Sequence, residues 1–383
     1  MFLFLLPAAM AAAVLVTHAA ARDELSPAAR LGQKLFNDVS LSASGAQSCA
    51  TCHVPAHAHA GSDGRAVPLG GPAMGTQGFR NAPSLRYLSG NTKFLFAADG
   101  TPTGGFAWDG RAASLGEQAR TPLLAAHEMD NVDAAHFAQK LRRAAYVDEF
   151  RQLYGAPVLD DDESVFEHAA DALGRFEIEA REFHPYDSKY DAVLAGRARL
   201  TAQEARGRQL FDDPQKGNCA SCHPSKTVDG QPPLFTDFTY DALGVPRNAE
   251  IPATADSGYF DLGLCGPDRK DLAARRELCG KFKVPTLRNV ALTAPYFHNG
   301  YFKTLEDAVA FYARRDTSPE QWYPRDAQGR VQKFNDLPPE LRGNVNVDEV
   351  PYNRKAGDAP ALSPQDIDDI VTFLQTLTDG WTP

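Results

Sequence analysis

The sequence predicts a mainly α-helical protein of two similar domains with long loops. Three observations support this fold class. A helix-forming segment, a turn-rich loop and a Cys-x-x-Cys-His motif follow one another twice within the 383 residues. Each half also ends in a segment with apolar residues at helical spacing. Between these segments lie stretches rich in Gly and Pro, such as residues 60–110 and 225–300, which contain few clear strands.

The opening helices are expected at residues 25–36 and 200–211, which lie 175 positions apart. Each begins beside a Ser or Thr, a residue type that caps helices by accepting a hydrogen bond from the first turn. Each then carries apolar or small residues at helical spacing. These residues are Leu25, Ala28, Gly32 and Leu35 in the first helix, and Leu200, Ala205, Gly207 and Leu210 in the second.

The closing helices are expected at residues 165–183 and 362–377. Their apolar faces consist of Ala169, Ala172, Leu173, Phe176 and Ile178 in the first half, and Ile367, Ile370, Val371, Leu374 and Leu377 in the second. The domain boundary then falls near residues 188–198. We therefore expect an N-terminal domain over residues 22–190 and a C-terminal domain over residues 195–383.

Residues 1–21 contain no Lys, Arg, Asp or Glu and consist of an apolar run followed by small residues. This pattern is typical of a secretory signal peptide. The run is shorter than the ~20 apolar residues that a spanning helix needs. We therefore expect a periplasmic protein that has no membrane span once the signal peptide is removed.

The formal net charge of −10 disfavours nucleic acid and acidic membrane surfaces as partners, because both are polyanions. A hydrophobic fraction of 43% and a charged fraction of 23% are ordinary for a globular protein. A small basic protein would be attracted to this negative charge, but net charge alone does not identify a partner.

Four of the six cysteines lie in the two Cys-x-x-Cys-His motifs, which comprise Cys49, Cys52 and His53, and Cys219, Cys222 and His223. Two thiols at this spacing can add to the two vinyl groups of one haem, and the adjacent His then reaches the iron. A zinc site usually needs further Cys or His at matching spacing, and a thioredoxin-like motif does not need the His. We therefore predict two cytochrome c-like domains with one covalent haem c each, and His53 and His223 as the proximal ligands.

The ligand on the other side of each iron decides between catalysis and electron transfer, because a second strong ligand excludes substrate. Met is the usual second ligand of electron-transfer cytochromes, and the last Met of this chain is Met129. The C-terminal domain therefore cannot supply Met to its own haem. Its iron is open, or is bound by His298 or by a less usual ligand such as Tyr.

At this point the sequence resembles the bacterial di-haem cytochrome c peroxidase superfamily, which includes the MauG-like enzymes. The resemblance covers nearly the whole chain after residue 21 and rests on several motifs in a fixed order. They are Arg80-Asn-Ala-Pro-Ser-Leu85, Trp108-Asp-Gly-Arg111, residues 122–129, Val284-Pro-Thr-Leu-Arg-Asn289 and Thr293-Ala-Pro-Tyr-Phe-His-Asn-Gly300.

The resemblance implies that the N-terminal haem reacts with hydrogen peroxide and that Gln118 and Glu128 lie on its distal side. A carboxylate over an open iron can take a proton from the near oxygen of peroxide and deliver it to the leaving oxygen. By itself, Glu128 would be interpreted as a solvated surface carboxylate. The resemblance also places Trp108 between the two haems, where an indole can relay electrons. Most tryptophans are simply core residues.

The family also has a calcium ion between its domains, and by position the ligands here are the Asn81 side chain and the carbonyl oxygens of Thr293 and Pro295. Oxygen ligands suit such a hard cation. At the second haem the classical peroxidases supply a Met, whereas Tyr312 stands at that place here, as in MauG-like members. A phenolate lowers the haem potential relative to Met. In a Phe-Tyr dipeptide the common alternative is an ordinary aromatic residue packed in the core.

Some classical members place a His from the loop after the first motif over the peroxidatic iron. In this chain the loop has only His57 and His59, which lie very near Cys52. We expect both to lie too near the proximal side to reach over the haem, so that the first iron is open. The alternative for both is an ordinary surface histidine. Cys265 and Cys279 enclose a charged loop, and in an oxidising compartment they predict a structural disulfide worth roughly 3 kcal/mol.

Three hypotheses follow, in decreasing order of support. The first is a MauG-like enzyme that reacts with hydrogen peroxide at the N-terminal haem and shares oxidising equivalents with the C-terminal haem. The second is a cytochrome c peroxidase that removes peroxide with electrons from a small redox protein. The third is a di-haem electron-transfer protein without enzymatic activity.

Overall fold

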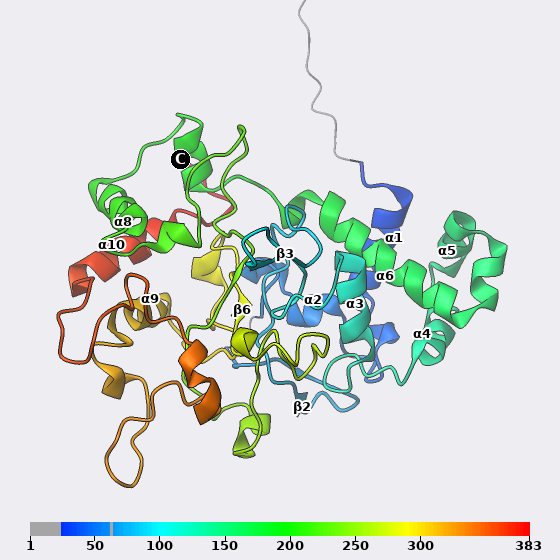
Figure 1. Cartoon of the computed structure of the whole chain (residues 1–383). Helices are drawn as coiled ribbons and strands as arrows, with labels where there is room; N and C mark the ends of the chain where they lie inside the picture. Colours follow the sequence, from blue (N-terminus) through cyan, green and yellow to red (C-terminus); the bar gives the residue numbers. More distant parts are fainter. Residues whose placement is uncertain (1–23, 62–63) are drawn as a thin grey trace, which may run out of the picture.

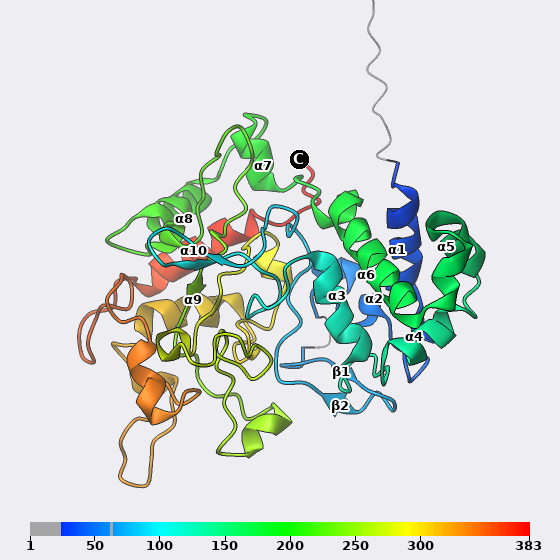
Figure 2. The ribbon, with the colours of Figure 1, turned by 45° about the vertical axis from the view of Figure 1, so that its right-hand side comes forward.

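The computed structural model describes residues 24–61 and 64–383. The signal peptide expected at residues 1–21 lies outside the described residues. Figure 1 shows two helical lobes with a layer of loops between them, and Figure 2 shows the same division after a turn. The predicted fold class, mainly helical with long loops, is confirmed.

The N-terminal lobe contains six helices in the described residues: α1 (Pro27–Asn37), α2 (Cys49–Cys52), α3 (Leu115–Leu124), α4 (Ala134–Leu141), α5 (Val147–Tyr154) and α6 (Asp162–Glu179). Helices α1, α3 and α4 all pack against the long α6. The first helix begins where the sequence predicts, because the Ser26 hydroxyl accepts a hydrogen bond from the Ala29 amide.

The remaining helices are α7 (Lys189–Leu194), α8 (Ala202–Asp212), α9 (Leu305–Arg314) and α10 (Pro364–Gln375). Helices α8 and α9 pack against α10, and all three lie together at the left of Figure 1. Reciprocal hydrogen bonds between Thr201 and Glu204 begin α8, and the same arrangement of Ser363 and Asp366 begins α10. Both helices match their predictions.

Strands are few and short among the described residues. They form three antiparallel pairs: β1 (Leu69–Gly70) with β2 (Thr76–Gln77), β3 (Leu95–Phe96) with β4 (Pro102–Thr103), and β5 (Tyr240–Asp241) with β6 (Phe282–Lys283). No helix in the described part of the chain has the length and apolar character needed to cross a membrane.

The same helix crossing is built twice. A Cβ added to Gly32 of α1 would lie 1.9 Å from the carbonyl oxygen of Ala172 on α6. A Cβ added to Gly207 of α8 would lie 1.8 Å from the carbonyl oxygen of Asp369 on α10. Only glycine permits such a close approach of two backbones. The two opening helices therefore meet their closing helices in the same way, as the repeat predicts.

Each crossing holds an aromatic core. Phe36 and Phe176 pack edge to face in the first lobe with ring centroids 5.5 Å apart, and Phe211 and Phe373 do the same in the second at 5.5 Å. The prediction that Ile178 faces the first core is wrong, because its side chain is 44% exposed. The buried face of α6 continues from Phe176 to Glu177 instead. Tyr190 of α7 packs in the second core, while the domain boundary itself stays a prediction.

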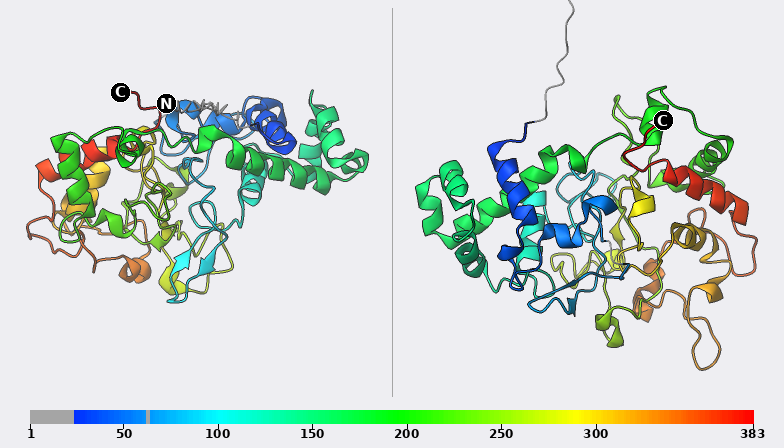
Figure 3. Two further views of the ribbon diagram at one scale, coloured as in Figure 1. Left: turned by 90° about the horizontal axis from the view of Figure 1, so that it is seen from above. Right: turned by 180° about the vertical axis from the view of Figure 1, so that it is seen from behind.

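Loops of the first half cross into the second. Main-chain hydrogen bonds join the Gly104 amide to the Phe238 carbonyl and the Lys283 amide to the Trp108 carbonyl, at 3.0 and 2.9 Å. The C-terminal segment also returns to the boundary between the lobes, as both views of Figure 3 show. There Asp379 accepts hydrogen bonds from Tyr87 at 2.7 Å and Asn289 at 2.6 Å. The loops that carry the predicted site residues are therefore held by both lobes.

Candidate functional site

The first motif begins on α2, and its histidine lies just beyond the end of that helix. The Nδ1 atom of His53 lies 3.0 Å from the carbonyl oxygen of His59. When Nδ1 carries the proton and donates it to this carbonyl, Nε2 keeps a lone pair for a metal. Burial lowers the pKa of His53, which favours the neutral ring that binds iron.

The second motif has the same arrangement in a different local structure. Cys219 and its two followers form a 3-10 turn, and His223 Nδ1 lies 2.7 Å from the Phe235 carbonyl oxygen. Burial lowers the pKa of His223 as well. The four motif cysteines are thiols and not disulfide partners in the described structure. Both halves therefore fit covalent haem attachment with an iron ligand preset by its backbone hydrogen bond.

Of the two histidines that follow the first motif, His59 is not the ordinary surface residue offered as its alternative interpretation. Its side chain is 1% exposed, and its ring lies 4.3 Å from the ring of Phe183. The cause is a tight turn after the motif, where Ala58 and His59 both have positive φ angles of 53° and 56°. This turn directs the His59 ring into the core and its carbonyl group to His53.

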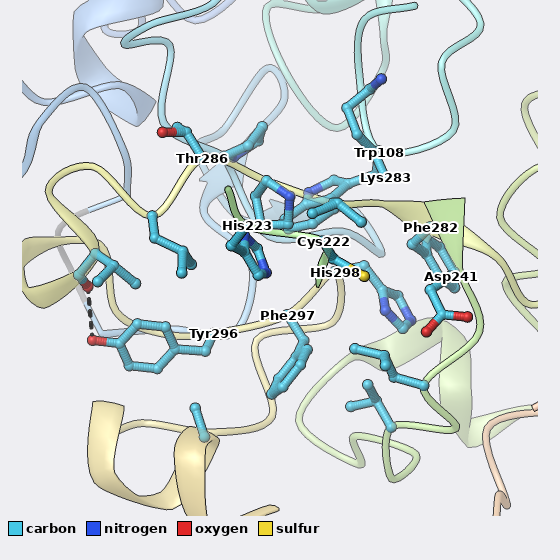
Figure 4. Close-up of a pocket in the computed structure, with 18 of the residues that line it drawn as sticks. Trp108, Cys222, His223, Asp241, Phe282, Lys283, Thr286, Tyr296, Phe297 and His298 are labelled. Atoms are coloured by element: carbon cyan, nitrogen blue, oxygen red, sulfur yellow. Dashed lines mark hydrogen bonds between the residues drawn. The ribbon is translucent and has the colours of Figure 1, made fainter. Parts of the chain in front are cut away.

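A cavity lined mainly by apolar side chains surrounds the second motif. Figure 4 shows Cys222 and His223 inside it, with Trp108 and Lys283 on one side and Phe297 on another. Its lining contains these predicted site residues: Asn81, Trp108, Gln118, Cys219, Cys222, His223, Thr293, Pro295 and Tyr312. A mainly apolar cavity whose wall holds a Cys-x-x-Cys-His motif is the environment that a covalently bound haem needs.

Tyr312 projects from α9 into this cavity. Burial raises the pKa of its phenol far above the ordinary value, and the nearby Cys222 and Cys219 thiols reinforce the effect. The side chain can therefore become a phenolate only beside a cation, and a ferric iron at His223 would supply one. His298, the alternative ligand, lines the same cavity, where its ring is stacked on Phe282 at 3.6 Å and its Nε2 atom lies 3.3 Å from Asp336.

Glu128 lies in the turn that follows α3. The Gly71 amide donates a hydrogen bond to its carbonyl oxygen at 2.8 Å and so fixes its backbone. The carboxylate Oε2 is buried and has no hydrogen-bond partner among the described residues. Burial raises the pKa of Glu128 to about 7, an effect that Arg111 opposes and Asp268 reinforces. The side chain can therefore give and take a proton near neutral pH.

The carboxylate of Glu128 is close enough to the first motif for its charge to act there. Burial raises the pKa of the Cys49 thiol to about 12, and the charges of Glu177 and Glu128 raise it further. Gln118 lies on α3 and faces the large cavity together with Trp108. The structure thus places Glu128 near the first motif, whereas Gln118 lines the cavity of the second motif.

Trp108 is held from both halves. Its indole Nε1 donates to the Asn81 carbonyl at 2.8 Å, and its own carbonyl accepts from the Lys283 amide. Burial lowers the pKa of Lys283 to about 7, and the ammonium donates to the Gly104 carbonyl. The half-buried Trp108 and Lys283 side chains therefore come from two backbone segments that are hydrogen-bonded to each other at the boundary of the two lobes.

Two of the three predicted calcium ligands are brought together. The Asn81 side-chain amide lies 2.5 Å from the Pro295 carbonyl oxygen. Thr293 lies in the same cavity wall. All three donors are uncharged, and calcium in proteins usually takes six to eight oxygens that include carboxylates. No group of three or more His, Cys, Asp or Glu side chains able to hold a metal occurs among the described residues. The calcium site stays a prediction.

Sequence reasoning missed two buried polar side chains beside the first motif. Glu177 of α6 is 5% exposed, burial raises its pKa to about 8, and its Oε2 has no partner within the described structure. Gln47 donates to the Cys52 sulfur at 3.5 Å. A signal for Glu177 was present, because it stands four residues after Leu173 on the apolar face of α6.

The comparisons with known proteins agree with this site. A family model described as di-haem cytochrome c peroxidase matches residues 26–199. The methylamine utilization protein MauG of Paracoccus denitrificans is 36% identical over 96% of this chain and 93% of its own length. This chain belongs to the di-haem cytochrome c peroxidase family. It is therefore a peroxidase-type oxidoreductase with two haem c groups.

Relatives from both branches of the family are similar to the chain. The cytochrome c551 peroxidase of Pseudomonas aeruginosa is 32% identical over 80% of this chain and 77% of its own. Among solved structures, the diheme peroxidase BthA of Burkholderia thailandensis is 41% identical and has a TM-score of 0.86, covering 93% of this chain and 87% of that one. The family is thus established, and the branch has to be argued from the site.

Proposed function

We propose that this chain is a periplasmic, MauG-like enzyme that reacts with hydrogen peroxide at its N-terminal haem and shares the oxidising equivalents with its C-terminal haem. The observation that carries the proposal is Tyr312, whose buried phenol faces the cavity of His223 in a domain that contains no Met. A phenolate there gives the second haem a low potential and makes it a poor acceptor of electrons from a mild donor. The identity with MauG of Paracoccus denitrificans supports the same branch.

The first motif is proposed to be the site of peroxide cleavage. Cys49, Cys52 and His53 would hold the first haem, and Cys219, Cys222 and His223 the second. When bound, the haems supply the redox chemistry, taking up the oxidising equivalents of peroxide and passing them to an electron donor. The net reaction uses one hydrogen peroxide, two protons and two electrons, breaks the O–O bond and releases two waters.

Glu128 is proposed to move the proton in this reaction. Its buried Oε2 can accept a proton from one peroxide oxygen and return it to the other, so that the second oxygen leaves as water. Gln118 would hold the peroxide by hydrogen bonding from α3. Because the pKa of Glu128 is about 7, both its protonated and ionised forms are populated at neutral pH.

Trp108 is proposed to connect the two halves electronically. It lies in the wall of the cavity around the second motif, and its hydrogen bond to the Asn81 carbonyl ties the indole to the N-terminal half. The electrons come from an oxidisable side chain of a partner protein. We further propose that the calcium site of Asn81, Thr293 and Pro295 joins the proposed domains of residues 22–190 and 195–383.

The cytochrome c peroxidase reaction, with electrons from a small redox protein, is the second candidate. The similarity to the cytochrome c551 peroxidase of Pseudomonas aeruginosa over most of both chains favours it. The two candidates share the peroxide reaction and differ in the electron source. A second haem of high potential, reducible by a mild donor, is required only by the peroxidase.

The test is to add hydrogen peroxide to the oxidised holoprotein with no reductant and to follow its near-infrared absorption. We expect a long-lived charge-resonance band that involves both haems. A reaction that requires prior reduction of the protein would contradict the MauG-like assignment and favour the peroxidase. No reaction with peroxide in either oxidation state would contradict both.

A further inference from the structure

The disulfide-closed loop of the C-terminal half, residues 266–278, lies against the N-terminal half. Cys265 and Cys279 form the predicted disulfide at its base. The guanidinium of Arg269 donates to the Asp109 carbonyl at 2.9 Å and lies 3.8 Å from the centre of the Phe94 ring. Arg269 is only 6% exposed, so this is a buried contact. Residues 266–278 of the C-terminal half therefore contact the Trp108-Asp-Gly-Arg111 segment of the N-terminal half directly.

The same loop places a carboxylate on the last residue of that segment. Asp268 Oδ2 lies 3.3 Å from Nη1 of Arg111 and 3.9 Å from Nη1 of Arg80. Arg111 Nη1 also contacts both carboxylate oxygens of Asp109 at 2.9 Å. One guanidinium group is thus held between an acid of its own segment and an acid of the disulfide-closed loop.

Glu128 lies within reach of both members of this ion pair. The positive charge of Arg111 lowers the pKa of Glu128, and the negative charge of Asp268 raises it. Asp268 also raises the pKa of the neighbouring His127, and Arg111 lowers it. Packing joins the same cluster to the 127–128 turn: the Phe79 ring lies 6.2 Å from the His127 ring and 5.2 Å from the Arg80 guanidinium, which is 3.9 Å from Asp268. The Arg111–Asp268 pair therefore lies beside this turn, where its balance of charge acts on Glu128.

We propose that Asp268 is a positioning residue for the peroxide chemistry of Glu128, which it controls through Arg111. The inference rests on the proposed function of Glu128 and adds a residue from the opposite half of the chain. Asp268 raises the pKa of Glu128 in two ways. It holds the Arg111 guanidinium partly away from Glu128, and its own charge repels the Glu128 carboxylate.

The other groups that face Glu128 do not supply this control. From α2 only the Cys49 sulfur acts on it, and that sulfur becomes an uncharged thioether when haem is attached. Its own segment provides His127, whose pKa is lowered by burial, so that the ring is neutral near pH 7. Arg80 lies 3.9 Å from Asp268, but its charge is compensated by closer contacts with Asp109 at 2.6 Å and Asp261 at 2.7 Å.

The experiment compares Asp268→Asn with wild type in the full-length holoprotein. The Glu128 carboxyl group is titrated by infrared difference spectroscopy, in which its signal is the one lost in Glu128→Gln. We expect the midpoint to move down by about half a pH unit, the size typical of a partly exposed charge. The pH below which peroxide consumption slows should decrease as well. An unchanged midpoint in a folded variant would overturn the proposal.

Two further variants separate this role from a structural one. Arg111→Gln should move the midpoint upward, opposite to Asp268→Asn, and a shift in the same direction would contradict the mechanism. Glu277→Gln removes one carboxylate of the same loop, which is 61% exposed and pairs with Arg275, and should leave the midpoint unchanged. Thermal unfolding and both haem absorptions show that each variant is folded.

The infrared titration needs no peroxide, so it separates the two proposals. A wild-type protein that does not consume peroxide would contradict the proposed function, while the Asp268 shift would still be measured. A protein that consumes peroxide normally but shows no Asp268 shift would contradict only this inference.

Discussion

The two lobes are alike where they hold haem and different where they face it. In each lobe a capped helix crosses a closing helix at a glycine, and the motif histidine has its Nδ1 beside a backbone carbonyl. The likeness extends to the loops, because Phe106 pairs with Ala112 as Tyr296 pairs with Phe302, 190 positions later. The helices, the motif and the loop that are proposed to hold each haem therefore form a structural repeat.

The difference lies in the helix that each repeat places beyond this loop. Helix α3 packs on α6 after its Ser114 cap, and α9 packs on α10 after its Thr304 cap. The eighth residue of α3 is Pro122, and the eighth residue of α9 is Tyr312. Proline has no atom that can bind a metal, whereas tyrosine offers a phenol. We propose that this one position in a shared scaffold separates an open first iron from a second iron closed by Tyr312.

The second lobe also lacks a counterpart of Glu128. The turn after α3 carries a carboxylate whose pKa is about 7, while α9 ends at Arg314 and is followed by Arg315. Arg315 is 1% exposed and pairs with Asp316 at 2.6 Å. The first lobe thus has a buried carboxylate near neutral pKa where the second has a charge-paired arginine. In the proposed function, the repeat supplies the haems and the departures from it supply the chemistry.

The largest effect is expected from Glu128→Gln, which removes the group unique to the first lobe. Peroxide cleavage should slow by about 10²–10⁴-fold, the usual contribution of a general acid–base residue. Stopped-flow absorption after mixing with peroxide measures the rate. Both haems should remain attached, because Gln is the same size as Glu and residue 128 is not one of the cysteines that bind haem. An unchanged rate would mean that the two lobes do not differ in the way proposed.

The pH dependence of the wild-type rate sharpens this prediction. Proton acceptance needs the carboxylate, and burial raises the Glu128 pKa to about 7. The rate should therefore fall as the pH decreases through about 7, and this limb should be absent in Glu128→Gln. A limb that persists in the variant would assign the titration to another group.

Tyr312→Phe should make the second lobe resemble the first. Without the phenol, the low-spin electron paramagnetic resonance signal of the oxidised protein should change, and peroxide should still bind at the first haem. Tyr312→Met should raise the second haem potential by on the order of tenths of a volt, within the roughly 0.8 V range that axial ligands cover. Spectroelectrochemistry measures this shift.

Tyr352→Phe provides a matched control for Tyr312. Its ring lies 6.3 Å from the Tyr312 ring and it lines the same cavity, but its hydroxyl contacts Asp241 at 3.4 Å. Its removal should leave the low-spin signal and the potential unchanged. If Tyr352→Phe alters the signal and Tyr312→Phe does not, the ligand has been assigned to the wrong tyrosine.

The opening and closing helices could be predicted because local signals define them. Caps at Ser26, Thr201 and Ser363 and an apolar face of helical period are visible in sequence, and the helices begin at those caps. The haem motifs are equally local. These elements need no knowledge of distant contacts, which is why their positions agree with the structure.

Residues placed by distant contacts could not be predicted. His59 is buried because a turn with positive φ angles directs it against Phe183, and Ile178 is exposed because Glu177 occupies the buried face of α6. Asp268 reaches Arg111 from a loop 157 positions later in the chain. Local patterns carry no information on which loop lies on which site.

The smallest effects are expected at the feature that the lobes share. Gly32→Ala and Gly207→Ala each place a methyl group within 2 Å of a backbone carbonyl oxygen, so each helix crossing must open. Overpacking of this kind costs about 1–3 kcal/mol of unfolding free energy. Gly343→Ala is the control, because nothing lies within 4 Å of its added Cβ. Denaturant unfolding of the three holoproteins should show two similar losses and no loss in the control. A loss confined to one of the two crossings would show that the repeat in sequence does not carry equal weight in the stability of the two lobes.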